Sequence, residues 1–141
     1  RAVEIRRVRY LNRDPLSLDV SYFPLALGRR LQEEDLAGRD IFLIFEQDYG
    51  IRLGHAELVI GAHLADELQG RLLGIEEGSP LLFIDRLTHD DAGKPLDYEH
   101  LYYRGDAFRY RVSINRTRGD PKASGKRVAA PRRGAKRSRP R

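Results

Sequence analysis

The 141-residue chain contains no cysteine, no methionine and no tryptophan. Without cysteine it cannot form disulfides or thiolate metal sites, which agrees with a cytoplasmic location. No stretch approaches the roughly 18 apolar residues of a membrane-spanning helix, and the first ten residues are too charged for a signal peptide. We therefore expect a soluble protein with one main folded domain, because a single core usually organises about 100 to 200 residues.

Positive charge is concentrated at the C-terminus. Residues 1–117 contain 16 Lys and Arg against 20 Asp and Glu, whereas residues 118–141 contain 10 against 1. The second stretch also has no aromatic residue and no hydrophobic periodicity, so it cannot bury enough apolar surface to offset the entropy cost of ordering. We expect a folded domain over 1–117 and a disordered basic tail over 118–141, which either binds nucleic acid through phosphates or only aids solubility.

The pattern of apolar residues predicts a mostly antiparallel α+β domain with five or six strands and two to three helices. Alternation with period two indicates the strands, and Gly93 in the triplet Asp-Ala-Gly suits a hairpin turn. Leucines at helical spacing and Asp40 as an N-cap indicate the helices. The expected strands are 3–11, 16–23, 51–64, 80–90, 94–104 and 108–116, and the expected helices are 25–36, 41–49 and 65–73.

Four segments in this order and spacing resemble the UTRA domain, the effector-binding domain of GntR-type transcription regulators of the HutC subfamily. They are RRVRYLN with LDVSYFP, EQDYGIRLGHAELVIGA, LLGIEEGSPLLFIDRLTHDDAGKPLDYE and YYRGDAFRY, within residues 2–116. The resemblance implies a chorismate lyase-like fold, a homodimer, and a small polar metabolite as the effector. It also implies an N-terminal winged-helix DNA-binding domain, and the absence of a start methionine leads us to expect that such a segment is missing upstream.

The stretch DYEHLYYRGDAF at 97–108 contains the carboxylates Asp97 and Glu99, four aromatic residues and a Gly-Asp pair. On a strand, alternation places Asp97, Glu99, Leu101 and Tyr103 on one face, and their neighbours Leu96, Tyr98, His100 and Tyr102 on the other. The pattern leaves open which face meets a ligand. We expect the following Arg-Gly-Asp to be a turn, with Gly105 relieving the backbone and Asp106 capping the bend.

Arg7 and Arg9 are two residues apart on the first expected strand, so both guanidiniums point to one face and could hold a phosphate or carboxylate. The matching family positions bind the anionic part of the effector, and the alternative is a solvated strand face. The resemblance also implies that Asp19 contacts hydroxyl or amine groups of the effector, unless it is only a cross-strand partner for an Arg. It places Asp97 and Tyr103 in the same cavity.

The chain departs from the sugar-phosphate-sensing members of the family at two positions. Those members often carry a Ser and a Tyr where this chain has Asp40 and Phe42. An ionised Asp cannot donate to a phosphate, so Asp40 would neutralise a nearby Arg or favour a cationic or hydroxyl group, unless it is an ordinary helix N-cap. The candidate effector-binding residues are Arg7, Arg9, Asp19, Asp40, Phe42, Asp97, Glu99 and Tyr103.

No pattern for catalysis, a metal or a cofactor is evident. The four histidines lack the i, i+4 spacing of a metal site, and the chain has neither a Gly-rich phosphate loop nor a nucleophile elbow. We expect a non-enzymatic sensor without cofactor, whose effector shifts the arrangement of attached DNA-binding domains. Two alternatives remain: a chorismate lyase-like enzyme, because that enzyme shares the fold, and a stand-alone ligand-binding or dimerisation protein without a DNA-binding domain.

Overall fold

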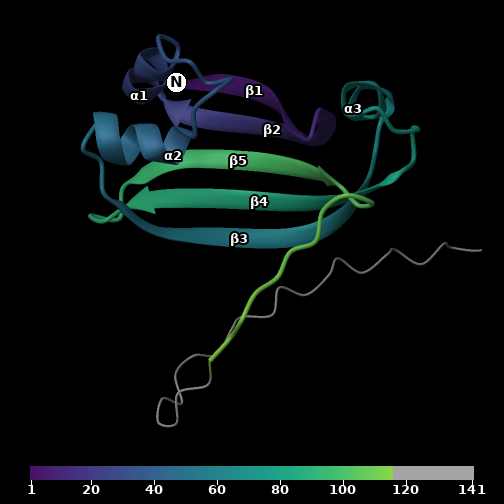
Figure 1. Ribbon diagram of the computed structural model, residues 1–141. Helices are drawn as coiled ribbons and strands as arrows, with labels where there is room; N and C mark the ends of the chain where they lie inside the picture. The colour runs from purple at the N-terminus through teal and green to yellow at the C-terminus, as the bar shows by residue number, and fades with distance from the viewer. Residues whose placement is uncertain (116–141) are drawn as a thin grey trace, which may run out of the picture. The chain divides into compact units, whose positions relative to one another are not determined.

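The computed structural model describes residues 1–115, whose strands form one antiparallel sheet with helices on both faces (Figure 1). Each strand pairs with its neighbours in antiparallel register. The strands are β1 (Ala2–Leu11), β2 (Asp14–Pro24), β3 (Leu53–Leu64), β4 (Pro80–Asp90) and β5 (Pro95–Arg104), and their order across the sheet is β1-β2-β5-β4-β3. The α+β class and a five-stranded antiparallel sheet are confirmed.

The first layer of helices packs near the end of the sheet where β2 finishes (Figure 1). It consists of α1 (Leu25–Leu31), α2 (Ile41–Leu43) and a π-helical turn, η1 (Ile44–Asp48). Its core contains Phe23, Leu27, Leu31, Ile41, Ile44, Phe45 and Leu96. Gly28 lets α1 approach β1 closely, because a Cβ at this position would lie 2.3 Å from the Cβ of Val3.

The third helix, α3 (Glu67–Leu73), packs on the opposite face of the sheet, against β2. Asp66 and Gln69 form a reciprocal capping box at its start, and Gly74 ends it with φ 66°. Leu18, Ala65, Leu73 and Leu81 form the core on this side. The two helical layers therefore cover different faces and ends of the sheet and leave the centre of the sheet for polar side chains.

Two expected elements differ from the structure. The helix expected over 25–36 ends at Leu31. Within its expected last turn, the Asp35 carboxylate instead accepts hydrogen bonds from the Ala37 and Gly38 amides and forms a local turn. The strand expected over 108–116 is wrong for residues 108–115, which lie in no strand. The helix expected over 41–49 is present as α2 and η1, with Gly50 at φ 65° after it.

No helix among residues 1–115 is long and apolar enough to cross a membrane. The tail expected over 118–141 lies outside the described residues.

Candidate functional site

One face of the three central strands is lined by polar side chains that are almost fully buried. They are Ser17, Asp19 and Ser21 on β2, Thr88 on β4, and Asp97 and Glu99 on β5, each at most 6% exposed. The question left open by the alternation of β5 is thus answered: Asp97, Glu99, Leu101 and Tyr103 point inward. Burying polar groups is costly unless they are paired, so the pairing of each residue shows where a ligand could act.

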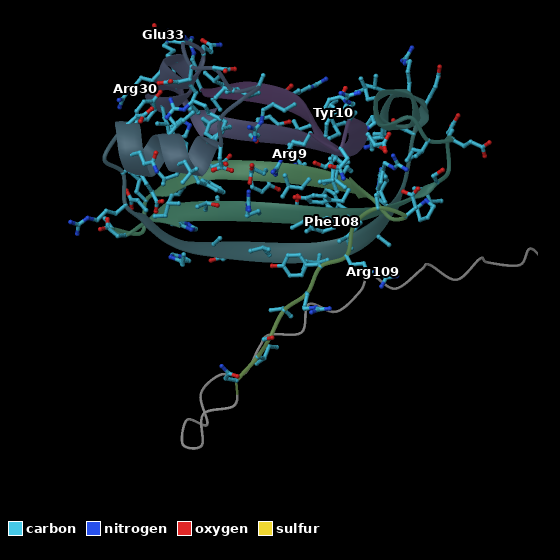
Figure 2. All side chains as sticks on the ribbon, viewed as in Figure 1. Arg9, Tyr10, Arg30, Glu33, Phe108 and Arg109 are labelled. Atoms are coloured by element: carbon cyan, nitrogen blue, oxygen red, sulfur yellow. The ribbon has the colours of Figure 1, made fainter. Side chains whose placement is uncertain are left out.

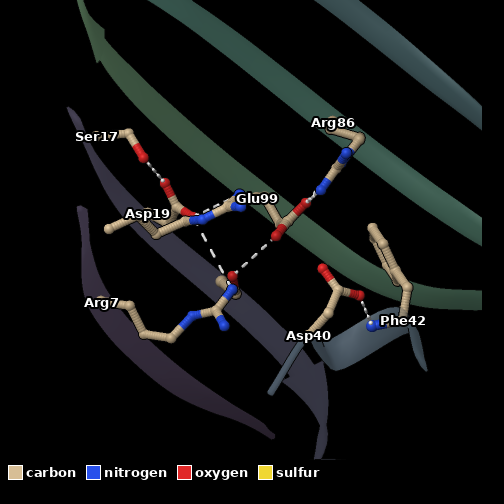
Figure 3. Close-up of polar contacts among 9 residues, drawn as sticks. Arg7, Ser17, Asp19, Asp40, Phe42, Arg86 and Glu99 are labelled. Atoms are coloured by element: carbon tan, nitrogen blue, oxygen red, sulfur yellow. Dashed lines mark hydrogen bonds and ion pairs between the residues drawn. The ribbon is translucent and has the colours of Figure 1, made fainter. Parts of the chain in front are cut away.

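Arg7 and Arg9 converge on Asp19, which lies opposite Arg7 in the β1–β2 register (Figure 3). Each guanidinium stands 3.9 Å from the same carboxylate oxygen, beyond hydrogen-bond distance. The other carboxylate oxygen accepts a hydrogen bond of 2.8 Å from the Ser17 hydroxyl. Burial raises the pKa of Asp19, and the Ser17 hydrogen bond and the two arginines oppose that rise.

Glu99 is held on both sides by hydrogen bonds (Figure 3). Its carboxylate accepts from the Ser21 hydroxyl at 3.2 Å and from Arg86 Nε at 2.6 Å, and a second Arg86 nitrogen also contacts it. The Arg86 guanidinium in turn lies over the ring of Phe42 in α2, 4.8 Å from the ring centroid. Glu99 is therefore paired, and Arg86 connects it to α2 through the Phe42 ring. The Arg86 nitrogens that face Glu99 are occupied by its carboxylate and are not free to bind a ligand.

Asp97 is the exception on this face. It is 2% exposed, and neither carboxylate oxygen has a hydrogen-bond partner among the described residues. Burial, together with the negative charge of Glu99, raises the pKa of the Asp97 carboxyl to about 9. Thr88 lies opposite Asp97 in the β4–β5 register, and its buried hydroxyl is also without a partner in the described part of the chain. These two side chains are unsatisfied polar groups that a ligand donor would stabilise.

Asp40 caps α2, as its plainer interpretation predicted. One carboxylate oxygen accepts hydrogen bonds from the amides of Phe42 and Leu43, at 2.9 and 3.1 Å. Asp40 also lines a cavity of about 720 Å³ between β1 and the loop 36–40. Arg7 and Arg9 line the same cavity, so three of the eight predicted residues meet there. Glu99, Asp97 and Tyr103 do not line it.

Tyr103 lies at the other end of β5, next to the turn that follows the strand. Its ring stacks on Phe108 with 3.9 Å between the centroids, and Phe108 and Arg109 follow that turn (Figure 2). Burial raises the pKa of the Tyr103 hydroxyl, and the charge of Asp19 adds to the rise. Tyr103 therefore belongs to the same polar face but is packed against the segment that leaves the domain.

Sequence reasoning missed Arg86, Ser17 and Ser21. The signal for Arg86 was its position in β4, where it follows Ile84 by two residues and so shares the inward face. The serines alternate with Asp19 on β2 in the same way, and only Asp19 stood out as ionisable.

A second cavity, of about 430 Å³, lies on the opposite face of the sheet against α3. Tyr22, His100, Tyr102, Leu68 and Leu72 contribute to its lining. Leu68 and Leu72 give it an apolar wall, and Arg6, Arg7 and Asp66 also line it. Arg7 therefore borders both cavities, whereas Arg9 lines only the cavity beside the loop 36–40. Among residues 1–115, no group of three or more His, Asp or Glu side chains is arranged to hold a metal ion.

The comparisons with known proteins agree with this geometry. The sequence model of the UTRA domain family matches residues 1–109. Transcriptional regulator YydK of Bacillus subtilis is 28% identical over 111 residues, covering 79% of this chain and 47% of the relative. The transcriptional repressor NagR of Bacillus subtilis is 28% identical over 107 residues, covering 76% of this chain and 44% of the relative. The chain thus spans about half the length of these relatives.

Solved structures show the same fold. The ligand-binding domain of a GntR-family transcriptional regulator from Bordetella bronchiseptica is 30% identical and superposes with a TM-score of 0.74, covering 81% of this chain and 74% of that domain. The crystal structure of YydK gives a TM-score of 0.76 at 26% identity, covering 81% of this chain and 50% of that one. The chain therefore belongs to the UTRA domain family, which is the family of effector-binding domains in GntR-type transcription regulators.

Proposed function

We propose that this domain binds a small polar metabolite in the cavity between β1 and the loop 36–40, and that binding controls a transcription regulator. The observation that carries the proposal is the incomplete pairing of Arg7 and Arg9. Both reach Asp19 only at 3.9 Å, both line the 720 Å³ cavity, and the buried Nε of Arg7 has no partner among the described residues. Their remaining donors are arranged to receive an anionic group.

The charges around the arginines indicate the chemistry of the effector. Asp19 and Asp40 stand beside Arg7 and Arg9 and offset part of their positive charge. Two further arginines line the cavity, but Arg6 is paired with Glu4, and Arg39 is paired with Glu34 and Asp48. A phosphate dianion would be repelled by Asp40, which supports a carboxylate or another single anionic charge. Acceptor-only carboxylates also favour hydroxyl or amine groups on the remainder of the molecule.

The proposed action is non-catalytic. An effector changes the DNA affinity of a regulator only if it binds one arrangement of the attached DNA-binding domains more tightly than another, typically by about 1 to 3 kcal/mol. DNA recognition would be supplied by a winged-helix segment outside this sequence, in a homodimer located in the cytoplasm. The names of the relatives, which are transcriptional regulators and repressors, support this role.

The test is the thermal midpoint of the full chain against carboxylic acids, amino acids, polyols, amino sugars and sugar phosphates, with chorismate included. A ligand at about 100 times its dissociation constant adds roughly 2.7 kcal/mol, which corresponds to several degrees in a domain of this size. We expect one anionic class to raise the midpoint, and the shift to vanish in the Arg7→Ala/Arg9→Ala variant. Arg29→Ala, an exposed arginine on α1, is the matched control.

Three outcomes would contradict the proposal. A ligand shift that survives in the Arg7→Ala/Arg9→Ala variant would show that the anion binds elsewhere. Absence of any shift across the panel would remove the sensor role of this cavity. Conversion of chorismate to 4-hydroxybenzoate by the chain would show an enzyme in place of a sensor.

A further inference from the structure

The face of the sheet opposite the arginine site has a cavity that the proposed function does not use. It has a volume of about 430 Å³ and is lined by residues of α3, β1, β2 and β5, and we call it the α3 cavity. Leu18, Val20 and Tyr22 line it from β2, where they alternate with the inward-facing Asp19. Small-molecule sites usually have volumes of roughly 300 to 1,000 Å³, so the α3 cavity has room for one small ligand.

Helix α3 forms an apolar wall of this cavity. Leu68 and Leu72 are one helical turn apart, both line the cavity, and their side chains are 45% and 37% exposed. The helix itself is fixed on the sheet, because Leu73 is fully buried in a cluster with Leu18 and Leu81. The two exposed leucines are therefore held in place beside the cavity. An apolar ligand there would remove both side chains from water, which is favourable.

The cavity is aromatic where it meets the central strands. Tyr22 of β2 and His100 and Tyr102 of β5 line it. The His100 ring lies nearly parallel to the Phe83 ring, with 20° between their planes and 5.8 Å between the centroids. Tyr22 and Tyr98 contact the same ring edge-on, at 5.9 and 5.0 Å. These contacts fix the orientation of His100, so the cavity offers a preformed aromatic surface to a flat ring.

Asp85 sets the hydrogen-bonding role of His100. The Nδ1 atom of His100 lies 2.5 Å from a carboxylate oxygen of Asp85. Because a carboxylate accepts, Nδ1 donates, and the neutral imidazole then has its free lone pair on Nε2. The His100 side chain is 29% exposed and lines the cavity. Nε2 is thus the nitrogen that can accept a hydrogen bond from an N–H or O–H group of a ligand.

The charged residues at the α3 cavity are directed to other partners. Arg6 is paired with Glu4 at 2.6 Å, and the carboxylate of Asp66 caps α3. The Arg7 guanidinium points toward Asp19, which faces the other side of the sheet (Figure 3). Pairing and capping therefore use the charged groups of the lining, and burying a further charge beside Leu68 and Leu72 would be costly. The lining favours an uncharged ligand over an ion.

We propose that the α3 cavity binds a flat, uncharged aromatic molecule that carries one N–H or O–H donor. The ring of the ligand lies against Leu68 and Leu72 and reaches the aromatic surface at Tyr102, and its donor bonds to Nε2 of His100. This site is distinct from the anion site at Arg9, so the domain can hold two chemically different small molecules. The inference goes beyond the proposed function and does not depend on it.

The test is an NMR titration of the full chain with indole, in which the backbone amide signals are followed at pH 7.5, where a histidine is usually neutral. Two further probes each lack one feature: 1-methylindole has no donor, and cyclohexanol has a donor but no flat ring. We expect saturable shifts with indole at amides of α3 and β5. Both other probes should bind at least about threefold more weakly, because a neutral hydrogen bond typically changes an affinity by about threefold to tenfold.

Three variants separate the parts of the site. His100→Phe keeps an aromatic ring and removes the acceptor, so it should weaken indole by about threefold or more and leave 1-methylindole unchanged. Leu68→Asp places a charge in the apolar wall and should weaken both probes by about tenfold. Leu43→Asp makes the same change at a leucine of α2 that is 48% exposed and does not line the cavity, and it should bind both probes like the wild type. The dispersion of the amide signals shows whether each variant is folded.

Several results would overturn the inference. They are the absence of saturable shifts with indole, shifts confined to the loop 36–40, and equal affinities of the wild type for indole and 1-methylindole. Equal weakening of 1-methylindole and indole by His100→Phe would show a structural role in place of an acceptor. Arg9→Ala changes only the cavity beside the loop 36–40 and should bind indole like the wild type. The thermal shift at Arg7 and Arg9 tests the anion site separately, so either site can fail without the other.

Discussion

The guanidinium of Arg86 lies over the ring of Phe42, with 4.8 Å between its central carbon and the ring centroid. The same guanidinium donates to Glu99, which is 3% exposed. The short helix α2, which carries Phe42, is thereby joined to the middle of the sheet through the Arg86 side chain. The Phe42 ring is thus used to pack an arginine.

Arg86→Ala should strongly destabilise the domain, because it leaves Glu99 buried without its cation. Breaking a buried pair typically costs about 3 kcal/mol or more. The measurement is the free energy of unfolding in urea. The double variant Arg86→Leu/Glu99→Leu should recover much of the loss, and equal destabilisation by the single and double variants would contradict this account of the pair.

Asp97 makes stability depend on pH. Its carboxyl has a pKa of about 9 in the folded chain and about 4 when unfolded, so between these values the folded state holds a proton that the unfolded state has released. This contribution to stability is full below pH 4 and is lost as the pH rises toward 9. Asp97→Asn should therefore exceed the wild type in unfolding free energy at pH 8, by more than it does at pH 5.

The control for this prediction is Asp91→Asn, an exposed carboxylate in the turn between β4 and β5. It should follow the wild type at both pH values. Parallel pH profiles for the wild type and Asp97→Asn would show that Asp97 is ionised and paired in solution.

Substitutions of Asp40 can distinguish its role as a helix N-cap from its effect on anion binding. Asp40→Ser keeps a side-chain acceptor for the Phe42 and Leu43 amides and removes a negative charge from the cavity. We expect Asp40→Ser to change stability little and to tighten the binding of anionic ligands, most of all phosphate monoesters. Asp40→Ala removes the cap and should cost about 1 kcal/mol.

The measurement for Asp40 is the dissociation constant of one phosphorylated and one carboxylate ligand by calorimetry, in the wild type and in Asp40→Ser. Unchanged affinity for both ligands would place Asp40 outside the binding site. The unfolding free energies of the serine and alanine variants report the cap independently.

The period-two alternation of β2, β4 and β5 was sufficient to predict the strands, because each has one face that is regularly buried. Alternation did not reveal which face of β5 is inward, because both faces mix aromatic and ionisable residues. Only the pairing of Glu99 with Ser21 and Arg86 decides it. The convergence of Arg7 and Arg9 on one face could be predicted from their spacing, and the turn at Gly105 from its residues, but the stacking of Tyr103 on Phe108 is a contact that neither pattern specifies.

The errors have physical causes of the same kind. The segment 108–115 alternates like a strand, but alternation shows only that one face could be buried and does not supply a neighbouring strand, and these residues lie in no strand. The helix expected to reach residue 36 stops at Leu31, and Asp35 accepts hydrogen bonds from the Ala37 and Gly38 amides in place of helical backbone bonds. Both outcomes were decided by contacts beyond the local periodicity.

The central claim is that the effector binds at Arg7 and Arg9, on the polar face of the sheet. The most direct test is calorimetric titration of the compound that most raises the thermal midpoint. The proteins are the wild type, Arg7→Ala/Arg9→Ala, Arg9→Ala, which changes only the cavity beside the loop 36–40, and Leu68→Asp/Leu72→Asp, which alters the cavity on the opposite face. We predict that affinity falls at least tenfold in the double arginine variant, falls in Arg9→Ala, and is unchanged in the α3 variant. Loss of affinity in the α3 variant alone would place the effector on the other face of the sheet and contradict the account.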